Sequence, residues 1–88
     1  MDKRPVVKDI DYTLYFSKEG VIVFDIAVDI DGNVTSCELN KEKTTIISTP
    51  MKMKAKNRIM QGLKFESGLQ YPTFHRGYVQ IKLRPATE

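Results

Sequence analysis

GVIVFDIAVDIDGNVTSCEL, residues 20–39, decides the fold of this chain. Its first half is rich in β-branched residues, and large apolar residues stand at every second position: Ile22, Phe24, Ile26 and Val28. Because successive side chains of a strand point to opposite faces, these four predict one buried strand face. Asp31 and Gly32 then supply a turn, since glycine adopts positive φ without steric cost. Residues 34–39 are therefore predicted to return as a second strand.

The same stretch can also be aligned with a calcium-binding loop. If Gly32 is the glycine of an EF-hand, then Asp29, Asp31 and Glu38 fall on ligand positions. The first ligand position, however, is Ala27, which offers no side-chain oxygen. An EF-hand also needs a helix before its loop, and the β-branched run resists helix formation. We therefore prefer the hairpin and predict no metal site.

One helix and one further strand follow the hairpin. Thr49 suits the N-cap of a helix, and Pro50 suits its first helical position. Apolar residues then recur at four-residue spacing: Met51, Ala55, Ile59 and Leu63. Residues 78–84 alternate between apolar and polar side chains and stop at Pro85. The predicted fold class is α+β, with two layers: a three-stranded antiparallel sheet carries one helix on one face, in the order strand, strand, helix, strand.

The chain of 88 residues has the length of one domain. We expect residues 1–11, which are polar, to be a flexible tail at a boundary within a longer protein, and residues 12–88 to form the domain. Tyr12, Leu14 and Phe16 alternate and predict an extra extended segment before the first main strand. Its place in the sheet, and whether it covers a sheet edge, stays open.

The sequence offers few groups for catalysis. His75 is the only histidine, and Cys37 is the only cysteine, so an internal disulfide is impossible. We expect a surface-loop imidazole and a packed, unreactive thiol. No serine stands in a nucleophile elbow, and no glycine-rich phosphate loop is present. We therefore expect a protein that is not an enzyme and that uses no cofactor. The longest apolar runs are too short to span a bilayer.

The positive charge is concentrated in the predicted helix. The chain has a net charge of +3, and residues 51–65 contain no acid but five basic residues: Lys52, Lys54, Lys56, Arg58 and Lys64. Such a helix could bind nucleic acid or an anionic surface, with an affinity that falls steeply as salt rises. These residues are spread around the helix, however, as is typical of solvated surface charges. We therefore expect no nucleic-acid partner, and keep a basic binding module as the alternative.

Three motifs in order resemble a known domain. Glu19 and Gly20 begin an alternating strand that leads to the Asp31-Gly32 turn, residues 63–67 (LKFES) end the helix, and residues 77–83 (GYVQIKL) form the last strand. Together they are similar to the C-terminal domain of TonB-type energy transducers, over about residues 12–84. The chain resembles a divergent member of that family, because leucine and serine stand where its helix-end motif has tryptophan and proline.

The resemblance implies a periplasmic coupling domain. Such a domain captures the TonB box, a short N-terminal peptide of an outer-membrane transporter, by edge-strand addition. It transmits energy from the proton-motive force for nutrient uptake, in a protein anchored in the inner membrane and working with ExbB and ExbD. A monomer and a strand-exchanged dimer are both open. A TonB-like structural domain of another envelope protein is a further alternative.

The binding site is expected at a sheet edge, where unpaired N–H and C=O groups can accept an extended peptide. We expect residues 20–28 to be central, with residues 34–39 and 78–84 as the two edges. The resemblance points to the last strand, whose residues form the predicted site: Tyr78, Val79, Gln80, Ile81, Lys82, Leu83 and Arg84. Replacing Ile81 with proline is expected to abolish capture, because proline removes a backbone donor.

Overall fold

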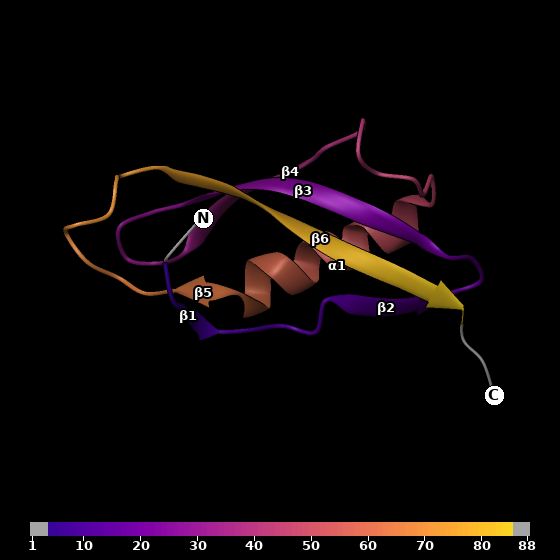
Figure 1. Ribbon diagram of the computed structural model, residues 1–88, viewed down its shortest axis with the longest axis horizontal. Coiled ribbons are helices and arrows are strands. Elements are labelled where there is room, and N and C mark those ends of the chain that lie inside the picture. Colours follow the sequence, from indigo (N-terminus) through magenta and orange to yellow (C-terminus); the bar gives the residue numbers. More distant parts are fainter. Residues whose placement is uncertain (1–3, 86–88) are drawn as a thin grey trace.

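A computed structural model describes residues 4–85 as one helix packed against a β-sheet (Figure 1). The elements in chain order are β1 (Val6–Lys8), β2 (Thr13–Phe16), β3 (Gly20–Val28), β4 (Val34–Leu39), α1 (Thr49–Gly62), β5 (Lys64–Phe65) and β6 (His75–Pro85). The α+β class predicted from the sequence is confirmed.

The main sheet has four strands, in the order β2-β6-β3-β4. β3 is antiparallel to both of its neighbours, whereas β2 runs parallel to β6. A separate antiparallel pair joins β1 to β5. The prediction of a three-stranded, purely antiparallel sheet is therefore wrong, because the extended segment before the hairpin adds β2 as a fourth, parallel strand. Alternation of apolar residues identified the extended segment at residues 12–16, but alternation does not say which strand a segment pairs with.

The N-terminal residues are also more ordered than the sequence suggested. Residues 1–11 were predicted to be a tail, yet β1 lies within them and Arg4 is buried. Residues 1–3 lie outside the described part of the chain. A polar segment without periodicity gives no signal for a strand of three exposed residues, which explains the wrong prediction.

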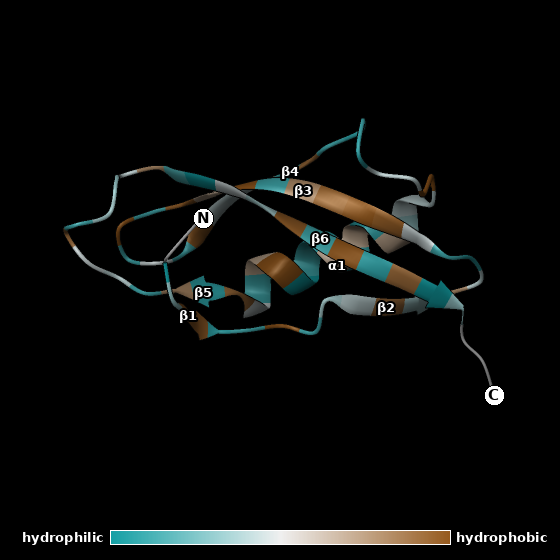
Figure 2. Ribbon diagram, viewed as in Figure 1, coloured by the Kyte–Doolittle hydropathy of each residue, from teal (hydrophilic) through white to brown (hydrophobic). Residues whose placement is uncertain are grey.

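The predicted strand faces are confirmed. Ile22, Phe24, Ile26 and Val28 of β3 are buried in the core shared with α1, whose Ala55 and Ile59 are fully enclosed. From β6 the core receives Val79, Ile81 and Leu83. Figure 2 shows the resulting alternation of hydrophobic and hydrophilic residues along β6. The other face of the sheet is not covered by the helix, and we call it the uncovered face.

The hairpin interpretation of residues 20–39 is also confirmed. β3 and β4 pair in antiparallel register, and Gly32 has a φ of 88°. Asp29 uses its carboxylate to accept a hydrogen bond from the Asn33 N–H at 2.9 Å. This aspartate therefore closes the turn. Within residues 4–85, no three acidic, histidine or cysteine side chains gather in a way that could hold a metal ion.

α1 begins one residue away from the predicted cap. Ser48, not Thr49, is the N-cap, and its hydroxyl accepts from the Met51 N–H at 3.5 Å. At the other end the chain passes close to Gly62, where an added Cβ would lie 2.7 Å from a methyl carbon of Ile10. Close packing thus explains a glycine in the last helical turn. No helix in the described residues is long and apolar enough to cross a membrane.

Candidate functional site

The position of β6 changes the predicted site. β4 is an edge strand, as expected, but β6 lies between β3 and β2. β2 pairs with only the last part of β6, from Thr13 opposite Lys82 to Phe16 opposite Pro85. The prediction that residues 78–84 form an edge is therefore wrong for Lys82, Leu83 and Arg84. Their edge is already occupied by the chain itself.

The first half of β6 continues beyond the end of β2. The Lys82 N–H donates to the Tyr12 carbonyl at 2.8 Å, so Lys82 points its backbone groups toward β2. Backbone groups alternate along a strand, and those of Tyr78 and Gln80 consequently point the same way. Within the described chain, no strand pairs with residues 76–81 on this side. We call residues 76–81 the open edge.

Ile81 belongs to the opposite set. Its register partner is Ile22 of β3, and its side chain is fully buried. Its N–H points toward β3, because it alternates with that of Lys82. Proline at Ile81 would therefore break the centre of the sheet, and the sequence-based choice of this position as a probe of the edge is wrong.

Two backbone carbonyls at the outer edge of β2 are bound by a helix side chain. On the outer side of β2, Arg58 Nη1 donates to the carbonyls of Asp11 at 2.9 Å and Thr13 at 3.0 Å. Arg58 is thus not simply a solvated helix charge. These two carbonyls are therefore not free to accept hydrogen bonds from the N–H groups of another strand.

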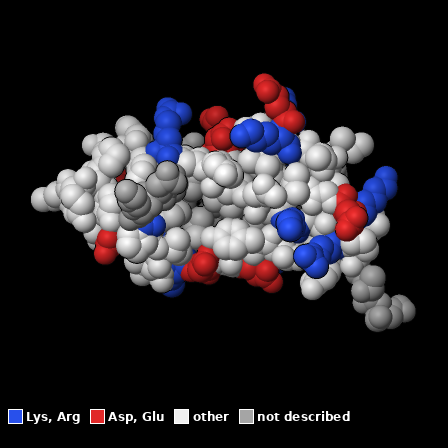
Figure 3. Space-filling model, viewed as in Figure 1, with Lys and Arg blue, Asp and Glu red and all other residues white. Residues whose placement is uncertain are grey.

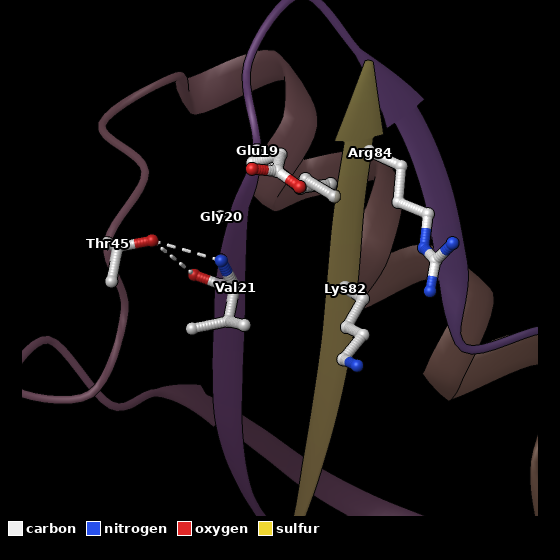
Figure 4. Close-up of a pocket in the computed structure, with 7 residues that line it drawn as sticks. Glu19, Gly20, Val21, Thr45, Lys82 and Arg84 are labelled. Atoms are coloured by element: carbon white, nitrogen blue, oxygen red, sulfur yellow. Dashed lines mark hydrogen bonds between the residues drawn. The ribbon is translucent and has the colours of Figure 1, made fainter. Parts of the chain in front are cut away.

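Loop residues cover the first half of β3 in a similar way. The Val21 N–H donates to Thr45 Oγ1 at 3.0 Å, and the Val23 N–H donates to Thr44 Oγ1 at the same distance. Figure 4 shows Thr45 beside Val21. These threonines do not belong to a strand, and no alternation or spacing along the chain identifies them. Their presence leaves the open edge of β6 as the better candidate for a partner strand.

The open edge carries polar and aromatic side chains on the uncovered face. Arg76, Tyr78 and Gln80 are exposed, and Tyr78 is 65% accessible. The Lys43 ammonium lies 5.5 Å from the centre of that ring. Asp25 is the register partner of Tyr78 on β3. Figure 3 shows Lys and Arg side chains on this face, with acidic groups nearby. An aromatic side chain at the edge offers contact area to a bound peptide.

A hollow of about 390 Å³ lies farther along β6, where β2 covers the edge. Figure 4 shows Lys82 and Arg84 of β6 together with Glu19 and Thr45. The hydroxyl of Thr45 is already bonded to the backbone of Val21. The hollow is lined by the cations of Lys82 and Arg84 and by the carboxylate of Glu19, and the hydroxyl of Thr45 is already hydrogen-bonded. This mixed lining favours neither an anionic nor a cationic ligand.

Cys37 lies where the sequence placed it, in a strand and packed. Only 4% of this residue is accessible, and burial raises the pKa of its thiol to about 11, with a small opposing effect of Lys56. A thiol rather than a thiolate is the stable form at neutral pH, so Cys37 is a poor nucleophile. His75, predicted on a surface loop, instead begins β6 and contacts Arg4.

Comparison with known proteins adds no relative: no family model, no curated protein and no solved structure matches the chain. The likeness to TonB-type domains therefore rests on the motifs of the sequence.

Proposed function

We propose that this chain is a peptide-binding coupling domain of the TonB type. In this proposal it captures the TonB box of an outer-membrane transporter as an added strand on β6. The observation that carries the proposal is the open edge, where Tyr78 and Gln80 direct backbone groups past the end of β2. Extended peptides bind such edges through main-chain hydrogen bonds, with side chains giving specificity.

The geometry limits where a peptide can add. β2 occupies the edge from Lys82 onward, and Leu14 of β2 is buried in the core. Arg58 also holds β2 from its outer side. We therefore place the peptide on residues 76–81, in line with β2 and ending near Tyr12. Lys82, Leu83 and Arg84, which the sequence included in the site, serve in this proposal to hold β2.

The wider role follows from the same resemblance. The domain acts in the periplasm, in a protein anchored in the inner membrane and coupled to ExbB and ExbD. A strand held by main-chain hydrogen bonds along β6 is loaded in shear when it is pulled along its length. Such an arrangement suits the transmission of force to a transporter, and it requires neither a catalytic group nor a cofactor.

The test is an amide NMR titration with a short transporter peptide that carries a TonB box. We expect chemical-shift changes concentrated in residues 76–81, together with new protection of the Tyr78 and Gln80 amides from hydrogen exchange. A peptide of the same composition in scrambled order is the control. An absence of shifts at millimolar concentrations of several such peptides would contradict the proposal, as would shifts confined to the helix.

A further inference from the structure

Arg4 is the one buried charged residue within residues 4–85, with 4% of its surface accessible. It joins four parts of the chain. Its Nε donates to the Glu66 carbonyl at 2.9 Å, and its Nη2 donates to the Asp29 carbonyl at 2.8 Å. Its Nη1 lies 3.3 Å from Nδ1 of His75, and its guanidinium carbon lies 4.0 Å from the ring centre of Tyr71. Arg4 is therefore well placed to anchor the N-terminal segment.

The contact between Arg4 and His75 sets the form of the imidazole. A guanidinium has only donors, so Nδ1 of His75 must accept the hydrogen bond. This requires a neutral imidazole that carries its proton on Nε2. Protonation of Nδ1 would remove the acceptor and would place two cations side by side. Partial burial and the neighbouring Arg4 both lower the pKa of His75.

The surrounding groups do not offset this repulsion. Tyr71 stacks on His75 with ring centres 6.2 Å apart, and its hydroxyl donates to the Glu66 carboxylate at 2.5 Å. On the β3 side, Asp29 offers Arg4 its carbonyl, while its carboxylate accepts from the Asn33 N–H. Arg76, which follows His75, is also cationic. Both nearby carboxylates are thus engaged elsewhere, and the neutral imidazole fits this site best.

Arg4 holds a segment that has few other anchors. We call residues 4–8 the N-terminal strap. The Pro5 carbonyl accepts from the Glu66 N–H at 2.9 Å, and β1 pairs with the two residues of β5. All three residues of β1 are exposed, so β1 itself buries little apolar surface. The stability of the strap therefore depends strongly on the contacts of Arg4.

We propose that the contact between Arg4 and His75 is a pH-sensitive latch, which holds the N-terminal strap on β5 while His75 is neutral and releases it when His75 is protonated. Because the pKa of His75 is lowered, the latch is fully closed above the ordinary histidine value of about 6.5 and is lost as the pH falls below it. The proposal does not depend on peptide capture at the open edge.

Hydrogen exchange of the Glu66 amide tests the latch, because this amide donates to the strap. After correction for the intrinsic exchange rate, we expect its protection to fall severalfold from pH 7.5 to pH 5.0, because protonation of His75 removes the acceptor for Arg4 and places two cations side by side. In a His75→Gln variant, which keeps a neutral acceptor, protection should not depend on pH. Equal losses in both proteins, or no loss in the parent, would overturn the proposal.

A second measurement covers the case in which His75→Gln does not fold. The imidazole of His75 is titrated by NMR in the parent and in an Arg4→Gln variant. Loss of the guanidinium should raise the titration midpoint toward the ordinary value of about 6.5. An unchanged midpoint would show that Arg4 does not control the protonation of His75, and the latch would be rejected.

Discussion

At the residue scale, single backbone groups decide what this domain can bind. Gln80 and Ile81 are neighbours, yet one points its N–H to the open edge and the other points it into the sheet. Either residue looks suitable in the sequence, because both belong to an alternating strand. The direction of the backbone N–H decides what a proline substitution tests: at Gln80 it tests peptide binding, whereas at Ile81 it tests folding.

Gln80→Pro should therefore abolish peptide binding, since proline removes an outward N–H while the bonds to β3 remain. Edge positions of a strand tolerate proline better than central ones do. Gln80→Ala keeps the N–H, and its affinity for the peptide should stay within about threefold of the parent's. Main-chain hydrogen bonds provide most of the affinity when a strand is added to a sheet edge. The measurement is peptide affinity by NMR or calorimetry, with circular dichroism to check the fold.

If Gln80→Pro folds and still binds normally, the open edge is not the docking site. If Gln80→Ala binds as poorly as the proline variant, the side chain rather than the backbone makes the contact.

Gly32→Ala should destabilise the domain. Gly32 has a φ of 88°, and an added Cβ would lie too close to the Phe65 carbonyl oxygen. We expect a loss of about 2 kcal/mol or more in the free energy of unfolding, since both backbone strain and a clash oppose the change. Urea unfolding measures it.

Gly68→Ala is the matched control, because its added Cβ would meet only the side chain of Gln70, which can move. We expect it to change stability by roughly 0.5 kcal/mol or less. Equal effects of the two alanines would contradict the role assigned to the turn at Gly32.

At the element scale, short segments outside the predicted fold complete the sheet. β2 occupies the edge of β6, and Arg58 of α1 holds β2 in turn. The helix thus has two roles: its apolar side covers the sheet, and its Arg58 binds two carbonyls at the outer edge of β2. This reduces the number of helix charges available to a nucleic acid, which was the alternative interpretation of the basic residues.

Arg58→Ala should loosen β2. It removes two charge-assisted hydrogen bonds to the carbonyls of Asp11 and Thr13. We expect the free energy of unfolding to fall by about 1–2 kcal/mol, because both carbonyls lie near the surface and can bind water instead. Amide exchange in β2 should increase with it. Lys54→Ala, an exposed position on the same helix, is the control and should stay within about 0.5 kcal/mol of the parent. Similar losses in both variants would show that Arg58 acts only as a helix charge.

At the scale of the whole molecule, one core joins the helix to the four strands of the main sheet and to Phe65 of β5. Cys37 of β4 lies in that core beside residues from β3 and α1. Its thiol reports on the opening of the whole domain, because burial keeps it away from reagents and raises its pKa to about 11.

We therefore expect Cys37 to react with a thiol reagent at pH 8 at least about a hundredfold more slowly in the folded protein than in urea, since exposure of a core group requires large-scale opening. The rate should increase as the protein is destabilised by urea below its unfolding midpoint. Fast labelling without denaturant would show that β4 opens separately from the rest of the sheet.

The sequence by itself determined the local structure. Three local patterns predicted it correctly: the alternation of residues 20–28, the Asp31-Gly32 turn and the spacing of apolar residues in α1. Each pattern depends only on residues that are near one another in the chain. They also predicted correctly which face of β3 and β6 is buried. Periodicity records the direction of side chains, which is a local property.

Only the tertiary structure decided the neighbours of β6 and therefore the extent of the open edge. The parallel pairing of β2 with β6 joins residues about seventy positions apart, and the period of a strand does not encode its partner. The same holds for Arg4, whose partners come from Asp29, Glu66, Tyr71 and His75. Long-range contacts of polar groups leave no pattern along the chain, because their spacing is set by how the elements pack in space.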